Sequence, residues 1–168
     1  MRPDEIRALQ APLKARYRDE PGAALVTLRA SGRLAQASLT CKVDTGRALV
    51  EAGLHPATGG SGLSACSGDM LLEALVACAG VTLGAVATSL GMSVEDGTIT
   101  AEGDLDFRGT LGVDKGAPVG FREIRLRFEL KTGAPEEEVA KLVDLTERYC
   151  VVYQTLRHSP RVAISHTP

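Results

Sequence analysis

The hydrophobic pattern of the chain contains one long helical segment between two groups of strand-like segments. Its apolar positions recur at helical spacing: Leu72, Leu75, Val76, Ala79, Leu83, Val86 and Leu90. This spacing predicts a helix over 69–90 that ends at Gly91. Apolar residues lie on more than one face, so we expect the helix to be central and deeply buried. Gly80 and Gly84 each cost about 1 kcal/mol relative to alanine in a helix interior, which indicates close packing against another element.

The segments before this helix alternate between apolar and polar residues over short lengths. They predict an antiparallel meander with strands at 24–30, 34–43 and 47–52 and turns at 31–33 and 44–46. Residues 53–68 hold five glycines and one proline and predict a loop. Glycine beside a helix lets backbone approach a ligand, although a plain flexible connection is the alternative.

The segments after the long helix predict further strands and two helices. Strand-like patterns cover 93–103, 104–110 and 121–130, with a long turn at 111–120, and the alternation is clearest in 121–130. A helix is expected from Pro135 to 149, with one or two more helical turns at 150–156 and a last strand at 161–164. Antiparallel strands with segregated helices predict the α+β class.

Composition narrows the class of protein. The length of 168 residues favours one domain, which we expect at 22–168, preceded by a peripheral arm at 1–21 whose helix formation three prolines limit. A net charge of −2 and an aromatic content of 4% disfavour a nucleic-acid partner. No run of eighteen apolar residues is present, so no membrane span is expected. The start lacks an apolar signal region, which predicts a cytoplasmic protein.

Cysteines are the candidates for chemistry. Four cysteines are too sparse for a disulfide scaffold, and a reducing compartment leaves them buried and inert, metal-bound or redox-active. The sequence has no CxxC pair, no histidine at ligand spacing from a cysteine, no G-x-S-x-G and no phosphate-binding loop, so no metal and no cofactor are expected. Cys78 lies in the middle of the long helix and Cys150 at the end of a later one. Each is either a small buried hydrophobe or a reactive thiol.

Two cysteine segments resemble a known family. Residues 59–83 (GGSGLSACSGDMLLEALVACAGVTL) and 147–156 (ERYCVVYQTL) resemble the two cysteine segments of the OsmC/Ohr family, named for osmotic induction and organic hydroperoxide resistance. The resemblance covers about residues 24–166. It implies an α+β fold of antiparallel sheets wrapped around two central helices in an intertwined homodimer. It also implies a thiol-dependent peroxidase in which Cys78 attacks an organic hydroperoxide, Cys150 resolves the sulfenic acid, and a dithiol reductant restores both thiols.

A buried apolar helix raises the pKa of a thiol, so a cation is expected near Cys78. The resemblance implies an arginine from an early strand, and Arg29 and Arg33 lie in the matching region, with Arg33 favoured. The resemblance implies an acid that holds this arginine, but that position is Gly68 here. Asp69, one residue later, is the candidate substitute, and Glu73 on the helix is another candidate partner. Solvated arginines and simple helix capping by Asp69 are the alternatives.

Two further thiols depart from the family pattern. Cys66 lies in the glycine-rich loop, where it is either inert or a competing resolving thiol, and Cys41 is expected to be structural. Because the usual acid is missing, two alternatives to the peroxidase remain. One is a non-catalytic module that binds a small apolar ligand at the dimer interface, and the other is a thiol redox sensor.

Overall fold

A computed structural model describes residues 2–5, 8, 11, 31–35, 40–44, 49–112 and 114–167. The chain divides into two compact units. Unit 1 comprises Met1–Arg7, Ala74–Thr100 and Phe128–Pro168, and unit 2 comprises Ala8–Glu73 and Ala101–Arg127. Of the expected arm, the described residues 3–5, 8 and 11 are helical. The division into an arm and a single domain stays a prediction.

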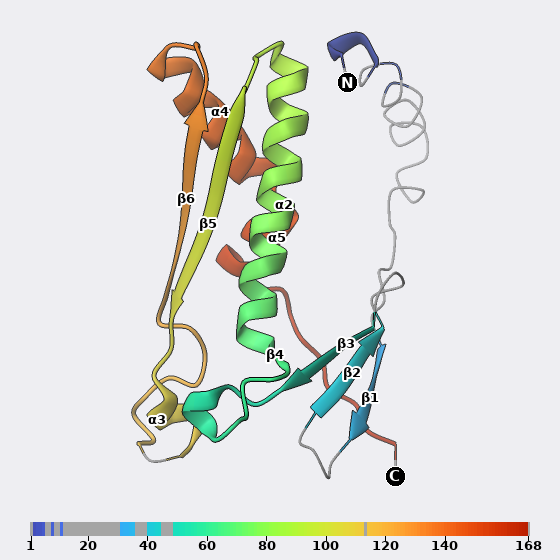
Figure 1. Ribbon diagram of the computed structural model, residues 1–168, viewed down its shortest axis with the longest axis vertical. Helices are drawn as coiled ribbons and strands as arrows, with labels where there is room; N and C mark the ends of the chain where they lie inside the picture. The colour runs from blue at the N-terminus through green and yellow to red at the C-terminus, as the bar shows by residue number, and fades with distance from the viewer. Residues whose placement is uncertain are drawn as a thin grey trace. The chain divides into compact units, whose positions relative to one another are not determined.

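Unit 2 contains a four-stranded sheet in the order β1-β2-β3-β4 (Figure 1). Its strands are β1 (Ser31–Ala35), β2 (Thr40–Asp44), β3 (Leu49–Gly53) and β4 (Ala65–Cys66). The first three pair antiparallel, and the two-residue β4 pairs parallel to β3. The expected meander is therefore present, but the predicted turn at 31–33 is wrong because these residues belong to β1, and the predicted strand 34–43 is divided between β1 and β2. The strand expected at 24–30 lies outside the described residues.

The chain between β3 and the long helix is mainly irregular, as the sequence predicts, with one short 3-10 helix. This helix, η3 (Pro56–Thr58), begins after His55, whose Nδ1 accepts the N–H of Ala57 at 3.0 Å. The imidazole ring stacks on Phe107 with ring centroids 4.9 Å apart. His55 therefore links the loop to the segment that contains Phe107.

The strand predicted at 104–110 is wrong, because Phe107–Thr110 forms the short helix α3. Only two apolar residues, Leu105 and Phe107, supported the alternating pattern there. A Cβ on Gly109 would lie 2.5 Å from the carbonyl oxygen of Pro118, and Gly112 has a φ of +68°. The glycines of this segment therefore permit a tight turn that a strand with side chains would not.

The long helix α2 (Ser67–Leu90) buries one stripe of side chains at four-residue spacing: Leu75, Ala79, Leu83 and Ala87. It ends as predicted at Gly91, where φ is +72° and the N–H groups of Gly91 and Met92 return to carbonyls of the last turn. A Cβ on Gly80 would lie 3.3 Å from Cδ1 of Ile99, which confirms close packing at this glycine, whereas Gly84 has no such neighbour.

Burial of α2 on every side is not observed in the single chain. Val81 is 76% exposed, and the helix ends also expose apolar residues. The buried stripe faces the other elements of the chain, and the remaining apolar surface has no cover among the described residues. By length and composition α2 is apolar enough to cross a membrane, although it is not an uninterrupted run of eighteen apolar residues, so the expected absence of a membrane span stays a prediction. One such helix is weak evidence, since core helices of soluble proteins meet the same test.

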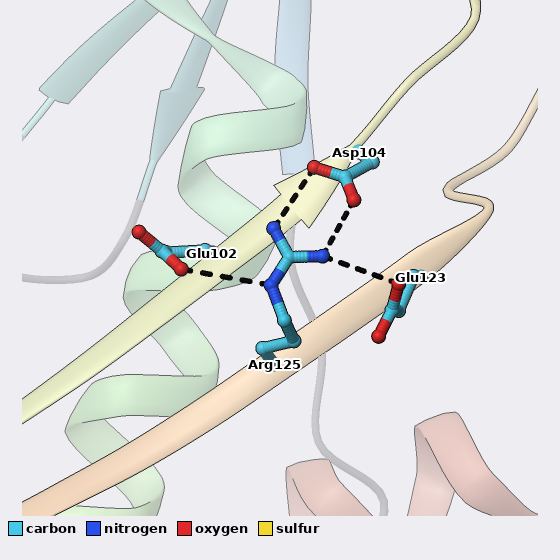
Figure 2. Close-up of polar contacts among 4 residues, drawn as sticks. All are labelled: Glu102, Asp104, Glu123 and Arg125. Carbon is cyan, nitrogen blue, oxygen red and sulfur yellow. Dashed lines mark hydrogen bonds and ion pairs between the residues drawn. The ribbon is translucent and has the colours of Figure 1, made fainter.

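The second sheet has two long strands, β5 (Asp96–Asp104) and β6 (Glu123–Lys131) (Figure 1). Arg122 N–H bonds to the carbonyl of Asp104 at one end, and Glu95 N–H bonds to the carbonyl of Lys131 at the other, so the strands are antiparallel. Figure 2 shows Arg125 of β6 among the carboxylates of Glu102, Asp104 and Glu123. Arg125 donates two hydrogen bonds to Asp104. Hydrogen bonds from Arg125 lower the pKa of Asp104. All four side chains are exposed, so the cluster fixes the strand ends more than it adds stability.

Two helices complete unit 1. The predicted helix after Pro135 is α4 (Glu136–Tyr149), and the additional helical turns are α5 (Val151–Arg157). Leu142 of α4 packs with Leu83 and Ala87 of α2, against partly buried side chains that include Phe128 and Leu130. The strand predicted at 161–164 is wrong: residues 159–167 form no strand, and Val162 and Ile164 are 79% and 94% exposed.

Truncation of Leu142 tests this core. Its side chain is fully buried, so Leu142→Ala should lower the free energy of unfolding by about 3 kcal/mol through lost burial and a residual cavity. Urea unfolding followed by circular dichroism measures the change. The exposed neighbour Lys141 provides the control, since Lys141→Ala should change stability by less than about 0.5 kcal/mol. Equal effects of the two variants would contradict the assignment of this core.

Candidate functional site

The thiols of Cys78 and Cys150 meet in unit 1. Cys78 is half-buried on α2, beside the fully buried Ala79, and Cys150 is 1% exposed between α4 and α5. Both thiols are free, and they lie close enough that each changes the pKa of the other. Two cysteines 72 positions apart in the sequence are thus brought together by the packing of the α4–α5 connection against α2.

Cys150 is the single residue that separates the two helices. Its backbone is extended, with φ −74° and ψ 110°, and it caps both the end of α4 and the start of α5. Its N–H donates to the carbonyl of Thr146 at 2.9 Å, and its carbonyl accepts the N–H of Gln154 at 2.9 Å. The first N–H groups of a helix have no partner within it, so those of Val151 and Val152 are free to bond to a nearby sulfur.

These donors act on Cys78. Burial raises the pKa of its thiol, but hydrogen bonds from the N–H groups of Val152 and Val151, from the Cys150 thiol and from the hydroxyl of Thr82 together outweigh burial. The pKa of Cys78 is therefore below its ordinary value. Backbone donors thus help to offset burial among the described residues, and the expected cation beside Cys78 stays a prediction.

Cys150 has the opposite shift. Burial raises the pKa of its thiol, and the neighbouring Cys78 raises it further, while N–H groups of Tyr153 and Val152 lower it less. The pair is therefore asymmetric, with the negative charge favoured on Cys78 and the proton on Cys150. Of the two sulfurs, Cys78 is therefore the one that forms a thiolate more readily.

A second layer of polar contacts joins α4 to α5 around Cys150. Tyr153 Oη donates to Glu147 Oε2 at 3.0 Å and accepts from Arg157 Nη1 at 3.2 Å. Arg157 Nη1 also lies 4.0 Å from Glu147 Oε2, and Gln154 Nε2 donates to the Glu147 carbonyl at 2.8 Å. Neither this group nor Thr82 is among the residues predicted from the sequence. Thr82 could have been found from its position four residues after Cys78 on one helix.

Unit 2 contains a cavity of about 320 Å³ beside the start of α2. Cys66, His55 and Asp69 line it together with the rings of Phe107 and Phe121. At Gly68, where the family carries an acid, an added Cβ would lie 3.6 Å from both Cys66 Sγ and Phe121 Cζ. The space next to this position is therefore bordered by a thiol and apolar side chains rather than by a carboxylate at 68.

The remaining predicted site residues belong to unit 2 or fall outside the described residues. Arg33 is in β1, with its side chain outside the described part, and Arg29 is outside it altogether. Asp69 is in the first turn of α2. Arg33 and Asp69 belong to unit 2 and Cys78 to unit 1, so their roles beside the thiol stay predictions. Within the described part of the chain, no three His, Cys, Asp or Glu side chains gather as metal ligands.

Solved structures share the fold over most of the chain, although their sequence identity to it is low. An OsmC-like protein from Mycoplasma pneumoniae is 19% identical with a TM-score of 0.66, covering 80% of this chain and 89% of that one. The organic hydroperoxide resistance protein OsmC of Legionella pneumophila is 21% identical with a TM-score of 0.63, covering 80% and 92%. The organic hydroperoxide resistance protein OhrB of Bacillus subtilis is 20% identical with a TM-score of 0.54, covering 81% and 94%. The search of curated proteins found no significant match.

These likenesses confirm the predicted α+β fold of the OsmC/Ohr type. The model of the family described as OsmC-like protein matches residues 59–165, a range that contains both Cys78 and Cys150. The chain therefore belongs to the OsmC-like protein family.

Proposed function

We propose that the protein is a thiol-dependent peroxidase that reduces organic hydroperoxides with Cys78 as the attacking and Cys150 as the resolving thiol. The observation that carries the proposal is a pair of neighbouring free thiols whose pKa values are shifted in opposite directions. A purely structural pair would need neither the contact between the sulfurs nor the backbone donors directed at one of them. Names of similar structures support the proposal, since those from Legionella pneumophila and Bacillus subtilis are called organic hydroperoxide resistance proteins.

The first step forms a bond between Cys78 sulfur and the distal oxygen of the hydroperoxide. The O–O bond breaks, and the alkoxide leaves with the electron pair and takes up a proton to become an alcohol, while Cys78 becomes a sulfenic acid. The lowered pKa of Cys78 keeps the reactive thiolate available for this attack.

The second step forms the disulfide. Cys150 sulfur attacks the sulfenic sulfur, and hydroxide leaves with the proton of the Cys150 thiol as water. A dithiol reductant then attacks this disulfide and becomes a disulfide itself, which returns both cysteines to thiols. We assign this cycle to the cytoplasm, where dithiol reductants are maintained. In the same proposal Arg33 holds the Cys78 thiolate and Asp69 orients that arginine.

A homodimer is part of the proposal. The exposed apolar surface of α2, which includes Val81, is the surface that a second copy would cover. A helix apolar on more than one face is stable in water when both faces are buried, and the single chain buries only one stripe.

Peroxide consumption under excess dithiothreitol tests the activity. The protein should consume cumene hydroperoxide faster than hydrogen peroxide, and Cys78→Ser should abolish the reaction. Cys150→Ser should lower it less, because dithiothreitol itself can attack the sulfenic acid. Cys66→Ser is the control and should leave the rate unchanged. If the unaltered chain is no faster than Cys78→Ser with either peroxide, the peroxidase is wrong and the apolar-ligand module becomes the preferred function.

The pH dependence of Cys78 alkylation tests the cause of its reactivity. Thr82→Val removes a hydroxyl donor at nearly constant volume, so the pKa of Cys78 should rise and its alkylation by iodoacetamide at neutral pH should slow about threefold to tenfold. Thr88→Val is the matched control, since the Thr88 hydroxyl donates to the Gly84 carbonyl within the same helix. Mass spectrometry of the peptide that contains residue 78 gives both rates. Identical pH profiles for the two variants would show that Thr82 does not stabilise the thiolate.

Analytical ultracentrifugation tests the second copy. The chain should sediment as a dimer, and Val81→Asp should shift it toward monomer because a buried carboxylate in an apolar interface costs several kcal/mol. Val81→Ile keeps the surface apolar and should remain dimeric. A monomeric unaltered chain, or a dimeric Val81→Asp, would rule out this surface as the interface.

A further inference from the structure

The angle between α4 and α5 sets the direction of the N–H groups that donate hydrogen bonds to Cys78. Val151 and Val152 are the first residues of α5, and their N–H groups reach Cys78 only while α5 keeps its direction after Cys150. The chain changes course at this one residue, whose extended φ and ψ belong to neither helix. A single extended residue does little by itself to fix the angle between α4 and α5, so contacts between the two helices must hold it.

The contacts between the two helices come from one residue of α4 and a group on α5. The Glu147 carboxylate accepts the Tyr153 hydroxyl at 3.0 Å, and the Glu147 carbonyl accepts the Gln154 side chain at 2.8 Å. Arg157 donates to the Tyr153 oxygen at 3.2 Å. The Tyr153 hydroxyl thus donates a hydrogen bond to α4, while its oxygen accepts one from within α5. Its acceptor is charged, and hydrogen bonds to charged groups are stronger than neutral ones.

We propose that Tyr153 is a positioning residue for the Cys78 thiol, which it acts on only through the direction of α5. The hydroxyl holds the first turn of α5 against Glu147, and the N–H groups of Val151 and Val152 are thereby directed at the Cys78 sulfur. Tyr153 touches neither substrate nor the reacting sulfur through its hydroxyl. Its effect on catalysis rests on the proposed peroxidase function, but its effect on the thiol does not.

The chain supplies a matched pair of tyrosines for the test. Tyr153→Phe removes the hydroxyl and keeps the ring, and Tyr149→Phe makes the same change at a residue that is 58% exposed and stacks under Arg148. The titratable group in contact with Cys78 is Cys150, which both variants retain. We would follow iodoacetamide labelling of the Cys78 peptide from about pH 5 to about pH 9, which spans the range of perturbed thiols.

Tyr153→Phe should move the labelling profile to higher pH and slow labelling at neutral pH about fivefold, as expected for weakened hydrogen bonds to a thiolate. Tyr149→Phe should match the unaltered chain. Glu147→Gln keeps an acceptor oxygen for the hydroxyl but loses its charge, so it should shift the profile less than Glu147→Ala, which should resemble Tyr153→Phe. Circular dichroism of each variant shows whether it is folded. Arg157→Ala, at an exposed side chain, should perturb the Tyr153–Glu147 hydrogen bond less than Tyr153→Phe does.

Two outcomes separate this inference from the peroxidase. If Tyr153→Phe shifts the profile while the unaltered chain consumes no peroxide, the positioning role stands and the peroxidase is wrong. If a folded Tyr153→Phe labels like Tyr149→Phe while the unaltered chain consumes cumene hydroperoxide, the positioning role is wrong and the peroxidase stands.

Discussion

The chemistry of this protein depends on hydrogen bonds to one half-buried sulfur. Burial alone would make Cys78 an ordinary, poorly ionised thiol, and the pKa is lowered only because several donors converge on it. Two of these donors are backbone N–H groups that exist as free donors because a helix begins there. The break between α4 and α5 at Cys150 therefore serves two purposes, since it places the second thiol and also supplies the donors for the first.

The asymmetry of the pair follows from the same arrangement. Cys150 is almost fully buried, and a charge on neighbouring Cys78 further disfavours a second charge. In the proposed peroxidase, the thiol with the higher pKa would react more slowly with peroxide and would be in place when the first sulfur is oxidised. Among the described residues, the opposite pKa shifts of the two thiols thus arise from burial and from hydrogen bonds at a helix end.

Prediction from sequence was accurate where a pattern was long and inaccurate where it was short. The period of α2, its end at Gly91 and the alternation of β6 each rest on many residues, and all three are present. The strand expected at 104–110 rested on two apolar positions, and local turn geometry overrides so short a signal. The strand expected at 161–164 has a strand-like pattern but no hydrogen-bonding neighbour within the described chain, and a strand needs one.

The sequence identifies the two candidate cysteines but not the hydrogen-bond donors that lower the pKa of Cys78. Cys78 and Cys150 could be paired only through the resemblance of their segments, because nothing in a spacing of 72 positions implies contact. Backbone N–H groups carry no residue signature, so a sequence cannot reveal the donors from Val151 and Val152. The most direct measurement is mass spectrometry of the chain after one equivalent of cumene hydroperoxide without reductant. The account predicts a disulfide that joins the peptides containing Cys78 and Cys150, and a product that leaves Cys78 unoxidised or joins Cys66 instead would contradict it.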